Sequence, residues 1–344
     1  MSCYRIKFKA KSPFSAYVES YTLFGALCWG TKLIFGENKL IEFLEKFKSD
    51  PPFLISSPLP LDQEKKEVYF PFFLPPEVFE KPRDISEYKI QKKLKKPQFL
   101  SRSQFLSFLK GEISLKELCL TLKNELIEEI QKTSRKKPEK LFQELNLLNN
   151  SLNRLTGTTL GGQLFNTLVY CRPYFIVFVY LRNKDFIKDL FNVDIKDYFG
   201  AIFEMVLLGG NKSVGFGRVE VKDIKEDKEL ENFLIPDDDT KVIYLLSPTF
   251  PDPVFDYSNP KSFYHLDVFF GFIDNTYERI SRALMKKKVL YLGSGSQLVL
   301  KQAKPFYGAL YPVFEGPSFY SSKNVTVYQY GYAFPLYPKN LSLT

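Results

Sequence analysis

A glycine-rich segment carries the residues whose types and spacing could do chemistry. Residues 209–218 read GGNKSVGFGR, and they comprise Gly209, Gly210, Lys212, Ser213, Gly215, Phe216, Gly217 and Arg218 around Asn211 and Val214. Glycines allow positive φ and let a ligand approach the backbone, where successive amides form an anion-binding concavity. The two cations could contact phosphates, and the phenylalanine could stack on a base. The spacing fits a nucleic-acid site and equally fits a glycine-rich turn without a ligand.

Two better-known phosphate-binding motifs do not fit this segment. In a Walker loop and in a dinucleotide-binding fingerprint, the glycines follow a strand and open a helix. Here a predicted helix at 186–208 precedes the glycines, and a strand pattern at 216–221 follows them. Because the order is helix, loop, strand, both of those motifs are excluded.

Histidine and cysteine usage excludes several other kinds of site. His265 is the one histidine of the chain, so a multi-histidine metal site is excluded. The four cysteines are far apart in sequence, which excludes zinc-knuckle spacing and predicts buried thiols in a reducing cytoplasm. They are Cys3, Cys28, Cys119 and Cys171. We therefore expect no metal and no cofactor.

Charge is distributed unevenly along the 344 residues, whose net charge is +9. Residues 86–141 hold 14 basic and 7 acidic side chains, whereas residues 220–239 hold 9 acidic and 3 basic ones. A basic surface interrupted by an acidic stretch fits a polyanionic partner, although a solvated lysine-rich surface has the same composition. The acidic runs at 226–227 and 237–239 are interpreted as solvated rather than metal-binding.

The apolar segments predict a protein without a membrane anchor. The start, MSCYRIKFKAK, alternates polar and apolar residues as a strand does, unlike a signal peptide. The longest apolar run, at 174–181, is far shorter than the roughly 20 residues of a membrane span. We expect a cytoplasmic location.

The order of the predicted elements indicates the fold class. The predicted elements follow one another in this order: a strand at 4–10, helices from 23 and at 39–47, short strands at 54–57 and 68–74, a strand at 174–181, the helix at 186–208 and a final strand. This is the split βαβ order of a ferredoxin-like domain with an insertion at about 60–150. Within that insertion, residues 76–97 look irregular and residues 114–133 helical.

A second cycle of similar elements follows an acidic linker at 226–239. It has strands at 242–246, 289–292, 297–300 and 325–336 and a helix at 276–285. We therefore predict an α+β protein with two ferredoxin-like (RRM-like) domains, at 1–225 and 240–344. The Gly- and Thr-rich residues 152–168 predict a β-hairpin that projects from the first domain.

Four segments resemble, in order, the motifs of one family. GGNKSVGFGR resembles the glycine-rich loop of the RAMP superfamily of CRISPR proteins. Three more segments resemble parts of the fourth subunit of type III-A Csm complexes. The segment SYTLFGALCWG at 20–30 is similar to its helix start, LNRLTGTT at 152–159 to its hairpin, and YQYGYAFPL at 328–336 to its C-terminal strand. The Pro-rich PPFLISSPLP at 51–60 also falls where that family has a strand. The sequence departs from the pattern at Tyr21, where Asp is usual, and at Lys212, where Arg is common.

The resemblance implies a non-catalytic subunit of a type III-A (Csm) effector complex in antiviral defence. Such a subunit holds the repeat-derived 5′ tag of the crRNA. Its partners are the large palm-domain, polymerase-like subunit and a backbone RAMP subunit. In this family the subunit is not itself a nuclease.

The resemblance also assigns RNA binding to three groups of residues. The glycine loop and the first-helix start would line one phosphate path, and the hairpin would act as a thumb that displaces a nucleotide near the tag–guide junction. These residues are Ser20, Tyr21 and Thr22 at the helix start, Arg154, Thr156 and Gly157 in the hairpin, and Gly209, Gly210, Lys212, Ser213, Gly215, Phe216, Gly217 and Arg218 in the loop.

Two other functions remain open at this point. One is a RAMP-type crRNA-processing endoribonuclease that uses His265 or a Tyr/Lys pair, although His265 lies far along the chain from the first helix. The other is a subunit that contacts only proteins, with its aromatic residues in interfaces.

Overall fold

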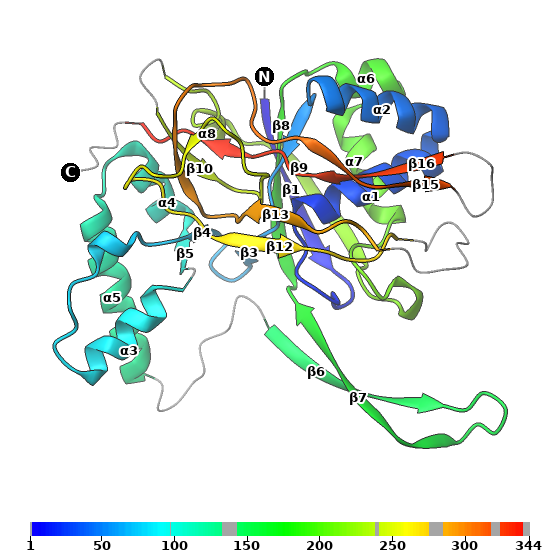
Figure 1. The fold of residues 1–344 in the computed structure, drawn as a ribbon, viewed down its shortest axis with the longest axis horizontal. Coiled ribbons are helices and arrows are strands. Elements are labelled where there is room, and N and C mark those ends of the chain that lie inside the picture. The colour runs from blue at the N-terminus through cyan, green and yellow to red at the C-terminus, as the bar shows by residue number, and fades with distance from the viewer. Residues whose placement is uncertain are drawn as a thin grey trace.

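An antiparallel seven-stranded sheet forms the centre of the molecule (Figure 1). The computed structural model describes residues 2–96, 98–132, 143–237, 241–274, 285–317 and 324–339. The strands lie in the order β5-β4-β3-β8-β1-β9, and β2 also pairs with β8. They are β1 (Ser2–Ala10), β2 (Phe53–Ile55), β3 (Leu59–Asp62), β4 (Glu67–Phe72), β5 (Gln98–Ser101), β8 (Tyr174–Leu181) and β9 (Val219–Glu226).

Helices cover one face of this sheet. They are α1 (Ser20–Phe35), α2 (Glu37–Ser49), α6 (Phe186–Phe191) and α7 (Ile195–Met205). Side chains in a strand alternate between faces, so the buried Phe8 of β1 points to the helices, where its ring centroid lies 5.0 Å from that of Phe203. Gly30 lets α1 approach α7, because a Cβ there would lie 2.5 Å from Ile202 Cγ2.

The strand order agrees with a split βαβ unit in the first half. The first and last strands, β1 and β9, are neighbours, and β8 lies between β1 and the β2–β3 segment. The predicted helix at 186–208 is present as α6 and α7, separated at Asn192, whose φ of 57° ends α6. The division of the chain into two ferredoxin-like domains stays a prediction.

The predicted insertion contributes to the main sheet. Its strands β4 and β5 extend the sheet beyond β3, and it also contains η1 (Pro76–Val78), α3 (Ile85–Leu94), α4 (Arg102–Lys110) and α5 (Leu115–Lys132). The expectation of an irregular segment at 76–97 is wrong for α3. Asp84 caps that helix by accepting a 2.7 Å hydrogen bond from the Glu87 amide, an N-cap signal that the lysine-rich composition obscured.

The projecting hairpin is longer than predicted. It consists of β6 (Gln143–Leu152) and β7 (Thr159–Cys171), and Figure 1 shows it reaching away from the body. The residues 152–168 therefore contain the tip and most of the returning strand, while the outgoing strand lies in the stretch assigned to the insertion. Its sequence, QELNLLNNSL, lacks strict alternation because both faces of the ribbon are exposed.

The described residues of the second half form three smaller sheets. Strands β10 (Val242–Leu245), β11 (Phe255–Asp256), β14 (Gln297–Leu300) and β17 (Pro335–Leu336) pair in the order β11-β14-β10-β17. Two ribbons pair β12 (Leu266–Phe269) with β13 (Val289–Leu292), and β15 (Leu310–Pro317) with β16 (Asn324–Tyr330). The strand expected at 325–336 is divided into β16 and β17. The helix expected at 276–285 lies outside the described residues except for Met285, which bridges to Phe272.

The largest hydrophobic cluster among the described residues extends across both halves. This cluster includes side chains of α1, β1 and β8 together with Tyr244, Tyr330 and Phe334 of the second half. The ring centroids of Phe24 and Tyr330 lie 4.8 Å apart, and the Tyr332 hydroxyl donates to the Phe47 carbonyl. The second half is thus packed directly against α1 and α2. No helix among the described residues is long and apolar enough to cross a membrane.

Candidate nucleic-acid interface

The segment 11–19, between β1 and α1, holds the glycine loop in place. The Gly217 amide donates to the Pro13 carbonyl at 2.9 Å, and the Gly210 amide donates to Ser15 Oγ at 3.1 Å. Ser12 Oγ accepts from the Arg218 amide at 2.9 Å. The loop is therefore fixed at both ends to a segment that is about 200 residues earlier in the sequence.

The same segment also holds the base of the hairpin. The backbones of Phe14 and Tyr170 exchange two hydrogen bonds of 2.9 and 2.8 Å. The rings of Tyr17 and Tyr170 lie 4.2 Å apart, and the Tyr17 hydroxyl donates to Glu144 at 2.9 Å. Because α1 begins at Ser20, the glycine loop, the hairpin and the helix start all meet at this segment. No sequence pattern predicted a role for this segment, which lies between the strand expected at 4–10 and the helix expected from 23.

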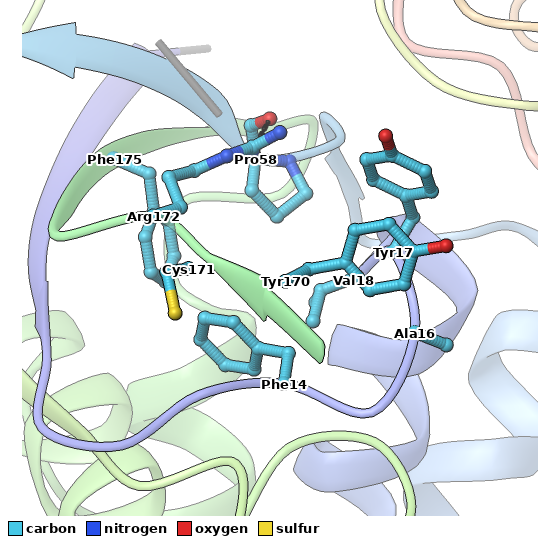
Figure 2. Close-up of a pocket in the computed structure, with 9 residues that line it drawn as sticks. All are labelled: Phe14, Ala16, Tyr17, Val18, Pro58, Tyr170, Cys171, Arg172 and Phe175. Atoms are coloured by element: carbon cyan, nitrogen blue, oxygen red, sulfur yellow. Dashed lines mark hydrogen bonds between the residues drawn. The ribbon is translucent and has the colours of Figure 1, made fainter. Parts of the chain in front are cut away.

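The hollow at this junction is too small for a base. Figure 2 shows it between Phe14, Tyr17, Tyr170, Arg172 and Phe175, and its volume is about 20 Å³. That is room for about one water molecule. A nucleotide at this junction would therefore bind on the surface.

Three amides in the middle of the glycine loop donate within the loop itself. The amides of Val214 and Phe216 donate to the Asn211 carbonyl, and the Gly215 amide donates to Lys212. This corrects the expectation of a concavity lined by successive free amides in this part of the loop. The loop instead presents side chains and open backbone to solvent at Ser213, Val214, Gly215 and Arg218.

Two loop residues predicted to contact RNA serve the fold instead. Lys212 is 8% exposed, and its ammonium pairs with Asp274 of the second half. Gly217 is buried at a φ of 80°, and a Cβ there would lie 1.9 Å from the Leu208 carbonyl oxygen. The expected phosphate contact of Lys212 is thus corrected, because the lysine side chain turns inward to a carboxylate. Gly209 and Phe216 are half-buried and Gly210 is exposed.

The start of α1 is also more enclosed than predicted. Ser20 is fully buried, so its hydroxyl cannot contact RNA. Tyr21 is packed between Phe269 and Tyr291, with ring centroids 4.6 and 5.2 Å away. The helix is preceded by Glu19, whose carboxylate accepts from Ser57 Oγ and whose pKa is raised by burial. Thr22 remains partly exposed beside this acidic group.

The hairpin tip presents its predicted residues to solvent. Arg154, Thr156 and Gly157 are exposed, and Leu155 is 96% exposed. Gly157 closes the turn at a φ of 67° by donating its amide to the Asn153 carbonyl at 2.8 Å. The tip therefore combines one cation with one unprotected apolar side chain.

The chain fold brings His265 close to the start of α1. His265 Nε2 lies 2.9 Å from Asp267 Oδ1, two residues before the Phe269 ring that packs on Tyr21. Asp267 is near enough to raise the pKa of Glu19, although less than burial does. The inference that His265 lies far from the first helix is therefore wrong in space. The His265 side chain is 53% exposed.

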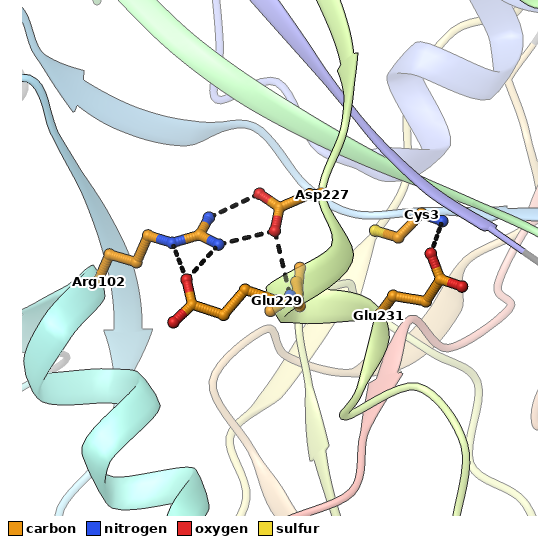
Figure 3. A network of polar contacts seen from close by, with 6 residues as sticks. Cys3, Arg102, Asp227, Glu229 and Glu231 are labelled. Atoms are coloured by element: carbon orange, nitrogen blue, oxygen red, sulfur yellow. Dashed lines mark hydrogen bonds and ion pairs between the residues drawn. The ribbon is translucent and has the colours of Figure 1, made fainter.

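The acidic stretch after β9 is partly buried rather than solvated. Figure 3 shows the Arg102 guanidinium donating to both Asp227 oxygens at 2.7 Å and to Glu229 Oε2 at 3.0 Å. The side chain of Asp227 is 4% exposed and also caps α8 (Lys228–Glu231). This corrects the solvated interpretation for Asp227, because an arginine of the insertion neutralises it, whereas Glu226 is exposed as predicted. Residues 238 and 239 lie outside the described residues. Among those described, no three His, Cys, Asp or Glu side chains are grouped to hold a metal.

The chain belongs to the RAMP superfamily, whose sequence model matches residues 11–220. Its fold is similar to that of a chain in the crystal structure of the "Csm3-Csm4 subcomplex in the type III-A CRISPR-Cas interference complex", with 20% identity, a TM-score of 0.60 and coverage of 99% of this chain and 100% of that one. It is also similar to a chain of the Csm1-Csm4 cassette crystallised with pppApA, at 18% identity and a TM-score of 0.53, covering 98% and 97%. No curated protein sequence matches. The prediction that the chain is a RAMP superfamily protein is confirmed.

Proposed function

We propose that this chain is the crRNA-binding subunit of a type III-A Csm effector complex, acting in the cytoplasm in antiviral defence. It holds the repeat-derived 5′ tag and bridges the large palm-domain subunit to a backbone RAMP subunit. The observation that supports this most is the full-length similarity to chains of a Csm3–Csm4 and a Csm1–Csm4 assembly, which have Csm4 in common. The meeting of loop, hairpin and helix start at segment 11–19 supports it independently.

The proposed activity is recognition without reaction. The exposed part of the glycine loop offers Ser213 and Arg218 to phosphates, and Phe216 presents a partly exposed ring. At the hairpin tip, Leu155 has the character of the apolar wedges that separate stacked bases, and Arg154 can contact the backbone beside it. The thumb would thus displace a nucleotide while the loop holds the strand.

The body of the hairpin supports contact with a partner subunit. Residues 145–152 and 159–171 contain no charged side chain, and Leu148 and Leu164 are 69% and 66% exposed. An isolated two-stranded ribbon is at best marginally stable in water. A partner protein whose surface covers the ribbon would stabilise it, because large exposed apolar patches commonly mark protein–protein contacts.

Co-expression with a CRISPR array and the neighbouring genes tests this proposal. We expect pull-down of the tagged chain to recover the other subunits and crRNAs with a uniform repeat-derived 5′ end that crosslink to this chain. Recovery of the partner proteins without crosslinked RNA would instead establish a subunit that contacts only proteins.

Arg218 and Lys212 are expected to differ in their effect on RNA binding. Arg218→Ala should weaken binding of single-stranded repeat RNA and reduce the slope of log K against log salt by about 0.7, the value for one phosphate contact to a single strand. Lys212→Ala should leave the slope unchanged, because its ammonium pairs with Asp274. Fluorescence anisotropy across a salt series measures both. Equal slopes for Arg218→Ala and wild type would remove Arg218 from the interface.

A crRNA-processing endoribonuclease is the second candidate, and the position of His265 and Asp267 near Tyr21 favours it. Under the non-catalytic proposal, purified chain should leave repeat RNA intact in buffer without partners, and His265→Ala should behave as wild type does. Site-specific cleavage that His265→Ala abolishes would replace the proposal by the enzyme. Denaturing gel analysis of end-labelled RNA distinguishes the two.

A further inference from the structure

A cationic hollow lies on the face of the main sheet opposite α1 and α7. It is lined by Arg5 and Lys7 of β1, Lys66 of the β3–β4 turn and Asp223 of β9, over an apolar floor that includes Ile176. Its volume is about 260 Å³, far larger than the hollow at the hairpin base. From this geometry we infer that the hollow and the adjoining Lys9 form a second RNA-backbone site, separate from the glycine loop. The inference rests on the proposed function in taking RNA as the polyanion.

The cations of this face form no ion pairs within the part of the chain that the structure describes, and Asp227, whose pKa the charge of Arg5 helps to lower, is already bound by Arg102. Among the described residues, no acidic oxygen lies within ion-pair distance of Arg5, Lys7, Lys9 or Lys66. Lys7 and Lys9 instead lie over the Tyr174 ring, 5.5 and 5.8 Å from its centroid. Like charges gathered around one hollow repel each other, and an anion bound among them removes that cost.

The two acidic residues of β9 that are opposite Lys7 and Lys9 are already paired with other lysines. Lys7 is opposite Asp223 in the sheet, but the Asp223 carboxylate lies 2.8 Å from Lys225 Nζ. Lys9 is opposite Glu220, whose carboxylate accepts hydrogen bonds from Lys11 and Lys222 that lower its pKa to about 2. Neither acid therefore neutralises Arg5, Lys7 and Lys9, which form a row of cations along β1.

The row of cations continues from the proposed loop site. β9 begins directly after Arg218, and the Lys11 amide donates to the Arg218 carbonyl at 2.8 Å, so Lys9, Lys7 and Arg5 follow along the neighbouring strand. Alternate residues of a strand recur about every 7 Å, which places one cation after another along an extended chain of phosphates. This continuity favours RNA over an acidic protein segment, because one strand can leave the loop and run along β1.

The test compares two triple variants of the full chain that make the same change in charge. Arg5→Ala/Lys7→Ala/Lys9→Ala removes the row, whereas Lys184→Ala/Lys188→Ala/Lys196→Ala removes three exposed lysines on the helical side. Binding of fluorescein-labelled single-stranded repeat RNA is measured by anisotropy between about 50 and 200 mM salt. We expect the row variant to bind about tenfold more weakly at low salt and to lose about 2 from the salt slope, with the control close to wild type.

Several outcomes would overturn the inference, and they separate it from the proposed function. In one such outcome, the row variant has the wild-type salt slope while the Arg218→Ala variant has a reduced salt slope. The glycine loop would then be an RNA site and the sheet face would not. Failure of the wild-type chain to bind RNA would overturn both. A row variant that binds RNA normally but fails to retain co-expressed subunits would assign the surface to a protein. Lys7→Gln, which keeps side-chain size, gives the same comparison if the triple variant misfolds.

Discussion

Replacing Arg102 by methionine is expected to lower the free energy of unfolding by about 3–5 kcal/mol, the range for removing one partner of a buried ion pair. Asp227 is 4% exposed, and without the guanidinium its carboxylate would be left buried and unpaired. The pair joins α4 of the insertion to the turn after β9 (Figure 3). We therefore expect the variant to loosen the insertion before the rest of the molecule. Chemical denaturation measures the first effect and hydrogen exchange of α4 the second.

The same pair predicts a dependence of stability on pH. Burial alone raises the pKa of Asp227. The hydrogen bonds and charge of Arg102, helped by the Leu230 amide and the charge of Arg5, outweigh it and hold the pKa below the ordinary value. A depressed pKa in the folded state stabilises the fold at pH values above the unfolded pKa of about 3.9. This stabilisation is lost as the pH falls through the folded pKa. The difference in stability between wild type and Arg102→Met should therefore shrink in acid.

A second ion pair of the same region, more exposed than Arg102 and Asp227, provides the control. Lys123 Nζ lies 2.9 Å from Glu87 Oε1, and the two side chains are 35% and 24% exposed. Lys123→Ala should cost about 1 kcal/mol, because water reaches both side chains and screens the pair. If Arg102→Met costs no more than this control, the buried pair does not hold the insertion to the body.

Replacing Gly217 by alanine is expected to cost about 2–4 kcal/mol, whereas Gly215→Ala should cost about 1 kcal/mol. Both glycines have positive φ, of 80° and 89°. The Cβ of residue 217 would meet the Leu208 carbonyl oxygen at 1.9 Å and break the 2.8 Å hydrogen bond from the Leu208 amide to Gly217. Nothing lies within 4 Å of a Cβ at residue 215, so only the backbone strain remains there.

This contrast decides which glycine can test RNA binding. A bulky residue at Gly217 changes the fold of the loop, so its effect on crRNA retention cannot be separated from unfolding. A bulky residue at Gly215 projects into solvent beside Ser213 and should weaken RNA retention with normal circular dichroism. Thermal denaturation of both alanine variants measures the difference. Equal losses of stability would mean that the contact with Leu208 relaxes at little cost.

The sequence by itself determined the family and the local elements. The alternation of β1 and the glycine loop depend on neighbours within a few residues, and the boundaries of the first strand and of the helix pair after β8 were predicted closely. The ordered motifs carried the RAMP assignment, because such motifs preserve local backbone geometry. The long hairpin and α3 were less visible, since an exposed ribbon lacks a buried face and a lysine-rich helix lacks a strong apolar stripe.

Only the tertiary structure decided which of the candidate residues face solvent. Lys212 pairs with Asp274, Ser20 is buried beside Ser57, Asp227 pairs with Arg102, and His265 lies near α1. Each of these contacts joins residues distant in sequence, and a motif says nothing about the side chain that folding places opposite it. From its sequence context, a lysine in a glycine loop is predicted to contact phosphate. The carboxylate that pairs with it in the fold comes from another part of the chain. Local patterns fix backbone conformation, whereas pairing between distant charges depends on how the layers pack.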